Sequence, residues 1–184
     1  MNRRVLIGVA ALVVGLFLIA FCASPVFAVR GIIGAAKAGD EAALSQRVDF
    51  PAFRDSLKDE LNARLVAEMR ADPRARDSAL GGLSLMLAPA LVSGAVDALV
   101  TPRTIVAMVE TAEAPDPMDR EPEPPASGRD RDIQRNYGYR GLNSFAVTLT
   151  DPDRPDEPID LLLERRGLFG WKLAGVDLPE RPAD

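Results

Sequence analysis

Apolar and polar residues follow three different patterns along the chain, and each pattern predicts a different kind of element. Residues 5–23 form an unbroken apolar run. Residues 29–110 mostly carry the three-to-four-residue repeat of helices. From Tyr139 onward, apolar residues alternate with polar ones as they do in β-strands. The order predicts an α+β protein: an N-terminal transmembrane or signal helix, then a helical half packed on a small C-terminal antiparallel sheet.

The N-terminal apolar run predicts that the protein is targeted to a membrane. Arg3 and Arg4 precede it, which favours keeping that end in the cytoplasm and sending the rest of the chain across. The run is longer than the usual signal core of about 7–15 residues and close to the roughly 20 that span a bilayer. We therefore favour a retained anchor over residues 1–24, followed by a single domain over residues 25–179 and a tail at 180–184.

Two alternatives remain open for this segment. Signal peptidase could remove it after Ala28, since Val26 and Ala28 form a tolerable small-residue cleavage site. The residues up to Cys22 also resemble a lipid-attachment box, although Phe21 stands where a small residue is expected. All three interpretations place the domain on the periplasmic, extracytoplasmic side of the cytoplasmic membrane.

Capping signals divide the helical half. An apolar stripe over residues 29–36 predicts a short helix, which Gly39 can end and after which Asp40 can cap the next one. Pro51 suits the first turn of a third helix. Residues 77–100 are a second apolar stretch, which we interpret as one or two buried helices, kinked at an internal proline, and not as a second span.

The remaining segments are a short helix, a loop and strands. Thr101 and Pro102 form a helix start. Residues 113–132 mix prolines with acids and predict a disordered loop inside the domain. Three strands are predicted, at residues 139–150, 159–165 and 171–178. Residues 151–158 are expected to connect the first strand to the second. Trp171 is expected to anchor the core of the sheet.

The composition excludes several kinds of chemistry. The chain has 184 residues and no histidine, which excludes Ser-His-Asp and Cys-His triads and histidine zinc sites. The net charge is −5 and no basic face is evident, which argues against nucleic-acid binding. The single cysteine, Cys22, permits no internal disulfide.

Few polar residues stand out as candidates for a site. Asp49 and Arg54 bracket a helix start, and they are interpreted as a cap with its ion pair or as a polar pair at a cavity entrance. Asp97 is interpreted as a solvent-facing or capping acid, or as a polar group at a pocket mouth. Arg165 and Arg166 are expected to be an exposed pair.

No metal, cofactor or catalytic residue is predicted, and the ligand-binding residues are unknown. The acids Asp151, Asp153, Asp156 and Glu157 could suggest calcium. They lack the glycine and the terminal bidentate glutamate that a calcium loop requires. No glycine-rich phosphate loop and no nucleophile elbow occur.

The segment over residues 24–58 carries the most specific motif. The sequence V-D-F-P-x-x-R-x-S-L-K at residues 48–58 follows a looser A-x-x-A-x-x-A-G-D pattern at residues 33–40. Both resemble the bacterial domain-of-unknown-function family 2939. Residues 100–102 and R-G-L-F-G-W-K-L at residues 166–173 are similar to the same family, so the resemblance extends over roughly Ser24 to Pro179.

The resemblance implies context and no catalytic residues, because the activity of that family is unknown. Its order of helices followed by a sheet is similar to the cystatin-like, or nuclear-transport-factor-two-like, cone. That similarity is a fold analogy and does not imply a function.

These patterns predict a membrane-anchored extracytoplasmic domain. We expect a non-enzymatic module of the cell envelope that binds an envelope protein or a small apolar ligand. The alternatives are an enzyme that uses carboxylates in a helix–sheet cavity, and a structural envelope protein without a pocket. A filled interior with an exposed apolar patch would favour a protein partner, whereas a deep cavity with converging polar side chains would favour a ligand or catalysis.

Overall fold

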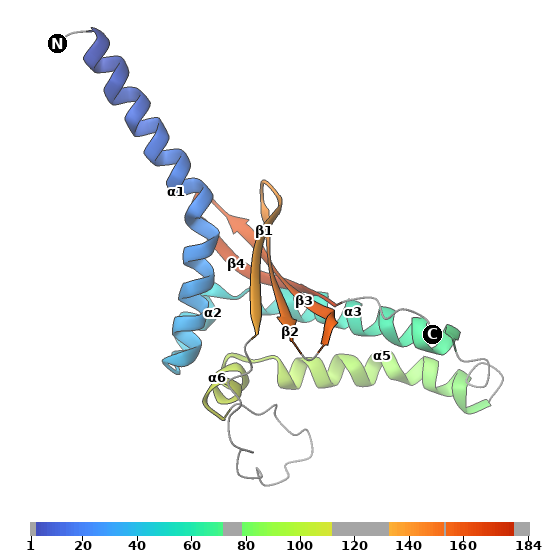
Figure 1. Ribbon diagram of the computed structural model, residues 1–184. Coiled ribbons are helices and arrows are strands. Elements are labelled where there is room, and N and C mark those ends of the chain that lie inside the picture. Colours follow the sequence, from blue (N-terminus) through green and yellow to red (C-terminus); the bar gives the residue numbers. More distant parts are fainter. Residues whose placement is uncertain (1–2, 72–78, 112–132, 153, 179–184) are drawn as a thin grey trace.

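The computed structural model describes residues 3–71, 79–111, 133–152 and 154–178. Helices are followed by an antiparallel sheet, which confirms the α+β class (Figure 1). The elements in chain order are α1 Arg3–Lys37, α2 Glu41–Arg47, α3 Phe50–Ala71, α5 Ala79–Leu99, α6 Pro102–Thr111, β1 Gln134–Gly141, β2 Ser144–Asp151, β3 Arg154–Arg166 and β4 Gly170–Asp177. The loop predicted at residues 113–132 and the tail predicted at 180–184 lie outside the described residues.

The apolar run and the first amphipathic stripe belong to one helix. The sequence predicts separate segments with a boundary between residues 24 and 25. However, α1, which is 35 residues long, crosses that boundary without a break. A proline inside a helix removes one donor and often breaks the helix. At Pro25 the break is avoided because Ser24 Oγ donates a hydrogen bond of 2.8 Å to the carbonyl oxygen of Phe21, which lies four residues before the proline.

The predicted helix ends and caps are confirmed. Gly39 has φ 66° just after α1, a conformation that glycine adopts without a Cβ clash. The Asp40 carboxylate accepts a hydrogen bond of 2.8 Å from the Ala43 amide at the start of α2. At the start of α6, the hydroxyl of Thr101 accepts one of 3.1 Å from the Thr104 amide.

The sheet has the order β1-β2-β3-β4, and every neighbouring pair is antiparallel. The single strand predicted over residues 139–150 is wrong: it is a hairpin in which Tyr139 pairs with Phe145. Gly141 ends β1, and the turn that follows contains Asn143; both are residue types that favour turns over strands.

The connection predicted over residues 151–158 is also wrong in part, because β3 begins at Arg154. The register between β2 and β3 is irregular there: Arg154 pairs with Asp151 and the regular ladder resumes at Ile159. The prolines between those two residues therefore lie where no ladder pairs form, which is where a strand tolerates them.

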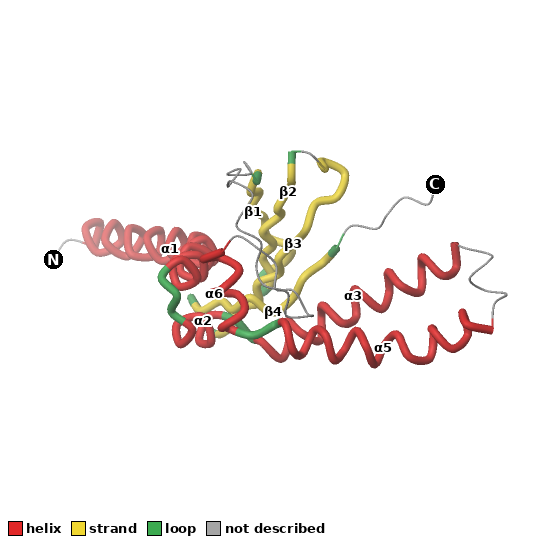
Figure 2. The backbone as a smooth tube through the Cα atoms, turned by 90° about the horizontal axis from the view of Figure 1, so that it is seen from below, coloured by secondary structure: helices red, strands yellow, loops and turns green. Residues whose placement is uncertain are grey.

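The helices surround β4 and leave β1 open. In Figure 1, the N-terminal end of α1 projects away on one side of the sheet, while α3 and α5 run side by side away from it on the other. Figure 2 gives the same arrangement from below, with α1, α2 and α6 grouped at one side of the strands and the α3–α5 pair at the opposite side. All residues of β1 are exposed.

The free edge of β4 is covered by the chain around the start of α3. The Asp49 amide donates to the carbonyl oxygen of Leu173 at 2.8 Å, and Val48 forms a parallel bridge with the same residue. Further along, Ser56 Oγ accepts from the Val176 amide and donates to its carbonyl oxygen, both at 3.0 Å. These contacts satisfy backbone groups that an open edge would leave available for pairing with another chain.

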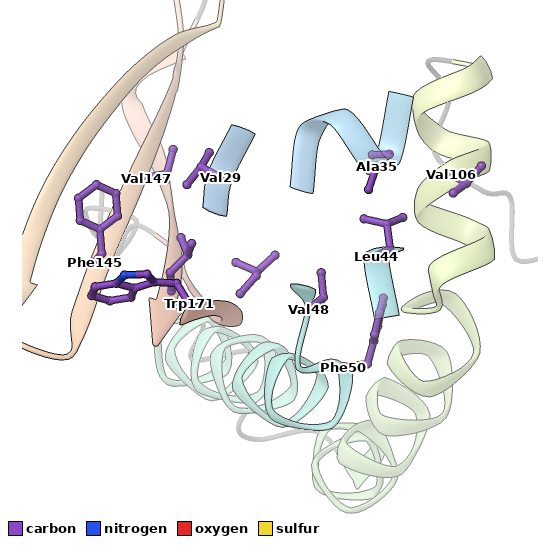
Figure 3. Close-up of a cluster of buried hydrophobic side chains, with 12 residues drawn as sticks. Val29, Ala35, Leu44, Val48, Phe50, Val106, Phe145, Val147 and Trp171 are labelled. Carbon is purple, nitrogen blue, oxygen red and sulfur yellow. The ribbon is translucent and has the colours of Figure 1, made fainter. Parts of the chain in front are cut away.

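Side chains from α1, α2, α6, the start of α3 and the sheet fill a common core (Figure 3). Leu44 of α2 and Leu163 of β3 are 0% and 1% exposed. Trp171 of β4 lies beside Phe145 of β2 in this core and is buried, as predicted. The complete cluster is Val29, Ala35, Ala36, Leu44, Val48, Phe50, Val106, Phe145, Val147, Leu163, Trp171 and Leu173.

The second apolar stretch is less buried than the sequence predicts. It is one helix, α5, which passes through Pro89 without ending. In its described second half, Val96 is buried, whereas Leu87 and Leu91 are 53% and 73% exposed. One side of α5 packs in the α3–α5 pair, and the other side is apolar and open.

The close approach of α3 to β4 predicts that Gly175→Ala destabilises the protein. A Cβ at Gly175 would lie 2.9 Å from Ser56 Oγ and 3.4 Å from Ser56 Cβ. We expect a loss of about 1–3 kcal/mol, typical of overpacking, measured by urea unfolding of the detergent-solubilised full chain with Trp171 fluorescence. The double variant S56A/G175A should lose less than the sum of the two single variants, because contacting residues are not additive.

Gly138→Ala is the matched control, since a Cβ there would meet no atom within 4 Å. Equal losses for G175A and G138A would contradict a steric role for Gly175.

Candidate functional site

Four polar residues of the V-D-F-P motif, Asp49, Arg54, Ser56 and Lys58, each make a separate contact with another element. Asp49 caps α3, accepting from the Ala52 amide at 3.4 Å, and its other carboxylate oxygen pairs with Arg166 at 3.0 Å. The expected pair of Asp49 with Arg54 is therefore replaced by a pair with Arg166. Arg54 instead donates from Nε to the carbonyl oxygen of Val100 at 2.8 Å, just after the C-terminus of α5.

The last motif residue joins the two long helices. Lys58 Nζ lies 2.7 Å from a carboxylate oxygen of Asp97, whose side chain is 54% exposed. Asp97 is thus the solvent-facing acid that the sequence predicts, with a partner on α3. Asp49 contacts the sheet, Ser56 contacts the edge of β4, and Lys58 contacts the helix α5. The motif therefore connects elements of the fold, and these side chains do not converge on a reacting centre.

The acids that suggested calcium do not come together. Glu157 lies 3.8 Å from Arg154 in an exposed ion pair, and Asp153 lies outside the described residues. Across the part of the chain that the structure describes, no three acidic or cysteine side chains are grouped as a metal site requires.

A cluster of polar and aromatic side chains lies at the junction between α1 and the sheet. The sequence does not predict it. Trp171 Nε1 donates to Ser24 Oγ at 2.8 Å, and that hydroxyl donates in turn to Phe21, completing the helix at Pro25. One residue further, the carbonyl oxygen of Cys22 accepts from the Tyr139 hydroxyl at 2.9 Å. Two aromatic side chains of the sheet therefore supply polar contacts at the point where α1 contains a proline.

Arg165 closes this junction and is not the exposed residue that the sequence predicts. Its guanidinium carbon lies 3.9 Å from the ring centroid of Phe21 and 4.2 Å from that of Trp171. A guanidinium between two aromatic rings gains both cation–π attraction and stacking. Arg166 is 47% exposed and pairs with Asp49 and Glu164, so the two neighbouring arginines have different roles.

The Ser-Pro dipeptide was the only sequence signal for this junction. Serine before a proline within an apolar run can replace the lost helix donor, but the sequence does not say which strand would meet it. The contact spans residues 24 and 171, 147 positions apart, and only the fold brings them together.

These features define a class of protein: an α+β domain built directly onto the C-terminal part of a long apolar helix. α1 is the one helix in the described ranges that is long and apolar enough to cross a membrane, and none of its most apolar window is buried. A signal sequence near the N-terminus would meet the same criteria. The structure therefore fits a single span or a signal peptide.

The chain belongs to the family described as protein of unknown function DUF2939, whose model matches residues 14–108, just over half of the sequence. The match begins inside α1 and ends inside α6, so it includes the V-D-F-P motif and stops before the sheet. Comparison with curated proteins and with solved structures gives no match. The cystatin-like arrangement stays a prediction.

The junction predicts coupled effects of Ser24→Ala and Trp171→Phe. Each change removes one partner of a buried hydrogen bond, which we expect to destabilise the folded state by about 1–3 kcal/mol. The double variant should lose less than the sum, since the bond is already absent in either single variant. Urea unfolding in detergent, followed by circular dichroism, measures all three.

Ser45→Ala is the matched control, because Ser45 makes the same kind of bond within α2, to the Glu41 carbonyl oxygen, at an exposed position. Strict additivity of S24A and W171F would contradict a direct link between the two side chains.

Proposed function

We propose that this protein is a non-enzymatic, protein-binding module of a bacterial cell envelope, held outside the cytoplasmic membrane by a retained single-span anchor. The observation that carries the proposal is the α1–sheet junction. Ser24 and Pro25 are buried, and both precede the cleavage site at Ala28. The end of the segment that signal peptidase would discard is therefore buried against the domain.

Cleavage after Ala28 would leave Trp171 without its acceptor and Arg165 without one of its two rings. A buried donor that loses its partner costs about 1–3 kcal/mol, and the apolar contacts of Pro25 would be lost as well. Retention of the helix is thus favoured by the stability of the domain, in addition to the length of the apolar run. The arginines before the run favour a cytoplasmic N-terminus.

A binding role is favoured over catalysis because the distinctive polar side chains are already engaged. Asp49, Arg54, Ser56 and Lys58 each contact another element of the fold. The core between the helices and the sheet is filled by Trp171, Phe145 and their neighbours. A filled interior argues against a small ligand seated between α1 and the sheet.

The open side of α5 supports a protein as the partner. Its exposed residues are apolar or small over three turns, with Asp97 as the only charge: Leu87, Pro89, Ala90, Leu91, Gly94, Ala95, Asp97 and Ala98. Small residues let a second helix approach closely, and exposed leucines provide apolar area to bury.

We take this partner to be a second copy of the chain. Copies anchored in one membrane carry their α3–α5 pairs at the same height, because these helices extend sideways from α1 (Figure 1). Anchoring also raises the effective concentration of one copy near another. An isologous contact centred on Leu91 brings the same mostly apolar surface together from both copies, and the one charge on it, Asp97, pairs with Lys58 of α3.

The retained anchor predicts a definite N-terminus. Intact-mass measurement of protein extracted from the membrane fraction should give a chain that still contains residues 5–28. A mature chain beginning at Val29, or one beginning at a lipid-modified Cys22, would overturn the proposed anchor. Extraction with carbonate at high pH is the parallel control, since a chain that spans the bilayer should stay in the pellet.

The second-copy partner predicts cross-linking through α5. In native membranes, Leu91→Cys in a Cys22→Ala background should give a covalent dimer with a short bis-maleimide. Glu41→Cys, on the exposed side of α2, is the control position and should give little dimer. Adding Leu87→Glu to the Leu91→Cys chain should reduce the yield, because it buries a charge in the contact.

Equal cross-linking at positions 91 and 41 would contradict self-association through α5. It would leave the retained anchor untouched, since that part of the proposal is tested by mass.

A further inference from the structure

The two turns at one end of the sheet lie beside the apolar helix. Because β1 to β4 alternate in direction, the β1–β2 turn at residues 142–143 and the β3–β4 turn at 167–169 share one end. The β2–β3 connection is at the other end. In Figure 1 the β3–β4 end of the sheet approaches α1, and the β1–β2 hairpin points to the same side of the sheet as the projecting part of α1.

Arg165 fixes these two turns to each other. Its Nε donates to the carbonyl oxygen of Leu142 at 3.0 Å, and its Nη1 donates to that of Leu168 at 2.7 Å. The same guanidinium stacks on Phe21 of α1. One side chain therefore holds both turns in place against the helix.

Both turns present large apolar side chains to the outside. Leu142 is 82% exposed, Leu168 63% and Phe169 44%. The residues of the turns carry no charge. Gly167, with φ 87°, shapes the second turn so that Leu168 and Phe169 stand at its tip.

The residues of α1 that these turns contact determine what surrounds the exposed side chains. The ring centroid of Phe169 lies 5.5 Å from that of Phe17 and 6.4 Å from that of Phe21. Both partners belong to the apolar run of α1. Phe17 precedes Phe21 by one turn, about 6 Å along the helix axis. If α1 spans a bilayer, Phe169 lies within the depth that the run occupies.

We infer that the paired turns, Leu142 together with Leu168 and Phe169, insert into the outer leaflet of the bilayer that α1 crosses. This inference rests on the proposed retained anchor. The partner is the lipid. Its acyl chains contact the three apolar side chains, and its headgroups lie at the level of Arg165 and Trp171. The protein then holds its membrane at two places, one spanning helix and one shallow contact.

Three features favour lipid over another protein at this surface. The contact is continuous with α1, so the lipid that surrounds Phe17 also reaches Phe169. Tyr139, which is 44% exposed, stands just behind the turns, at the level where tyrosine side chains concentrate in membrane proteins. An insertion of about 5–10 Å is the usual depth for apolar residues at the boundary of headgroups and acyl chains.

The test uses the full chain, with Cys22→Ala, reconstituted in phosphatidylcholine and phosphatidylglycerol vesicles. An environment-sensitive nitrobenzoxadiazole label is attached through Leu168→Cys in one sample and Pro152→Cys in the other. Pro152 is exposed at the opposite end of the same sheet. We expect a blue-shifted emission at position 168, with strong quenching by doxyl-labelled lipid, and water-like emission at position 152.

A second variant tests insertion directly. With the label at Leu142→Cys, adding Leu168→Asp should shift the emission back toward that of water, because a carboxylate opposes entry into acyl chains. Leu168 is exposed, so the change should leave the fold intact, which circular dichroism checks.

The outcomes separate this inference from the proposed function. Vesicle flotation reports the anchor: a chain that fails to float removes the proposed anchor and the inference with it. A chain that floats but has a water-like label at position 168 overturns the inference alone. A blue shift without quenching by doxyl lipid means that a protein covers the turns, and it also overturns the inference.

Discussion

The hydrogen bond from Trp171 to Ser24 is the contact on which the arrangement of helix and sheet depends. Pro25 lacks the amide that would bond to Phe21, and Ser24 supplies a donor in its place. That donor is itself fixed by the indole, which is buried in the core. The helix can therefore pass from its apolar part into the folded domain without a break, and the sheet supplies a contact at the proline.

A hierarchy of contacts follows from this junction. Arg165 adds its guanidinium above Trp171 and bonds to two turns of the sheet. On the far side of β4, Asp49 and Ser56 bind the edge of the same strand. β4 is thus held by α1 on one side and by α3 along its edge, while β1 remains exposed. The family match covers both helices that hold β4 and ends before the strand itself.

Much of the fold could be predicted because its signals are local. Gly39, Asp40 and Thr101 end or cap helices by contacts within four residues, and sequence reasoning finds such contacts well. The hairpin at Gly141–Asn143 was missed because apolar residues alternate on both sides of it, which hides a turn inside one apparent strand. The continuity of α1 at Pro25 was not predicted, because the contact that supports it joins Ser24 to Trp171, 147 positions away.

The candidate site was harder to predict than the fold. Arg165 and Arg166 are neighbours of the same type, yet one is stacked between rings and the other forms exposed ion pairs. Strand alternation explains the difference once the register is known, since successive side chains point to opposite faces. Nothing in the dipeptide itself reveals which face meets α1. The same holds for Leu87 and Leu91, whose exposure depends on which side of α5 packs in the α3–α5 pair.

The uninterrupted course of α1 has a mechanical consequence. No hinge separates its apolar part from the residues that bind the sheet, so if α1 spans a bilayer, as proposed, the domain must follow the helix when the helix tilts. Transmembrane helices tilt by about 20° on average, and a change in bilayer thickness alters that angle. With its 21 residues, α5 is about 30 Å long, so such a tilt would sweep its far end through roughly 10 Å. Under the proposed anchor, the direction of the α3–α5 pair relative to the membrane would therefore change with the thickness of the bilayer.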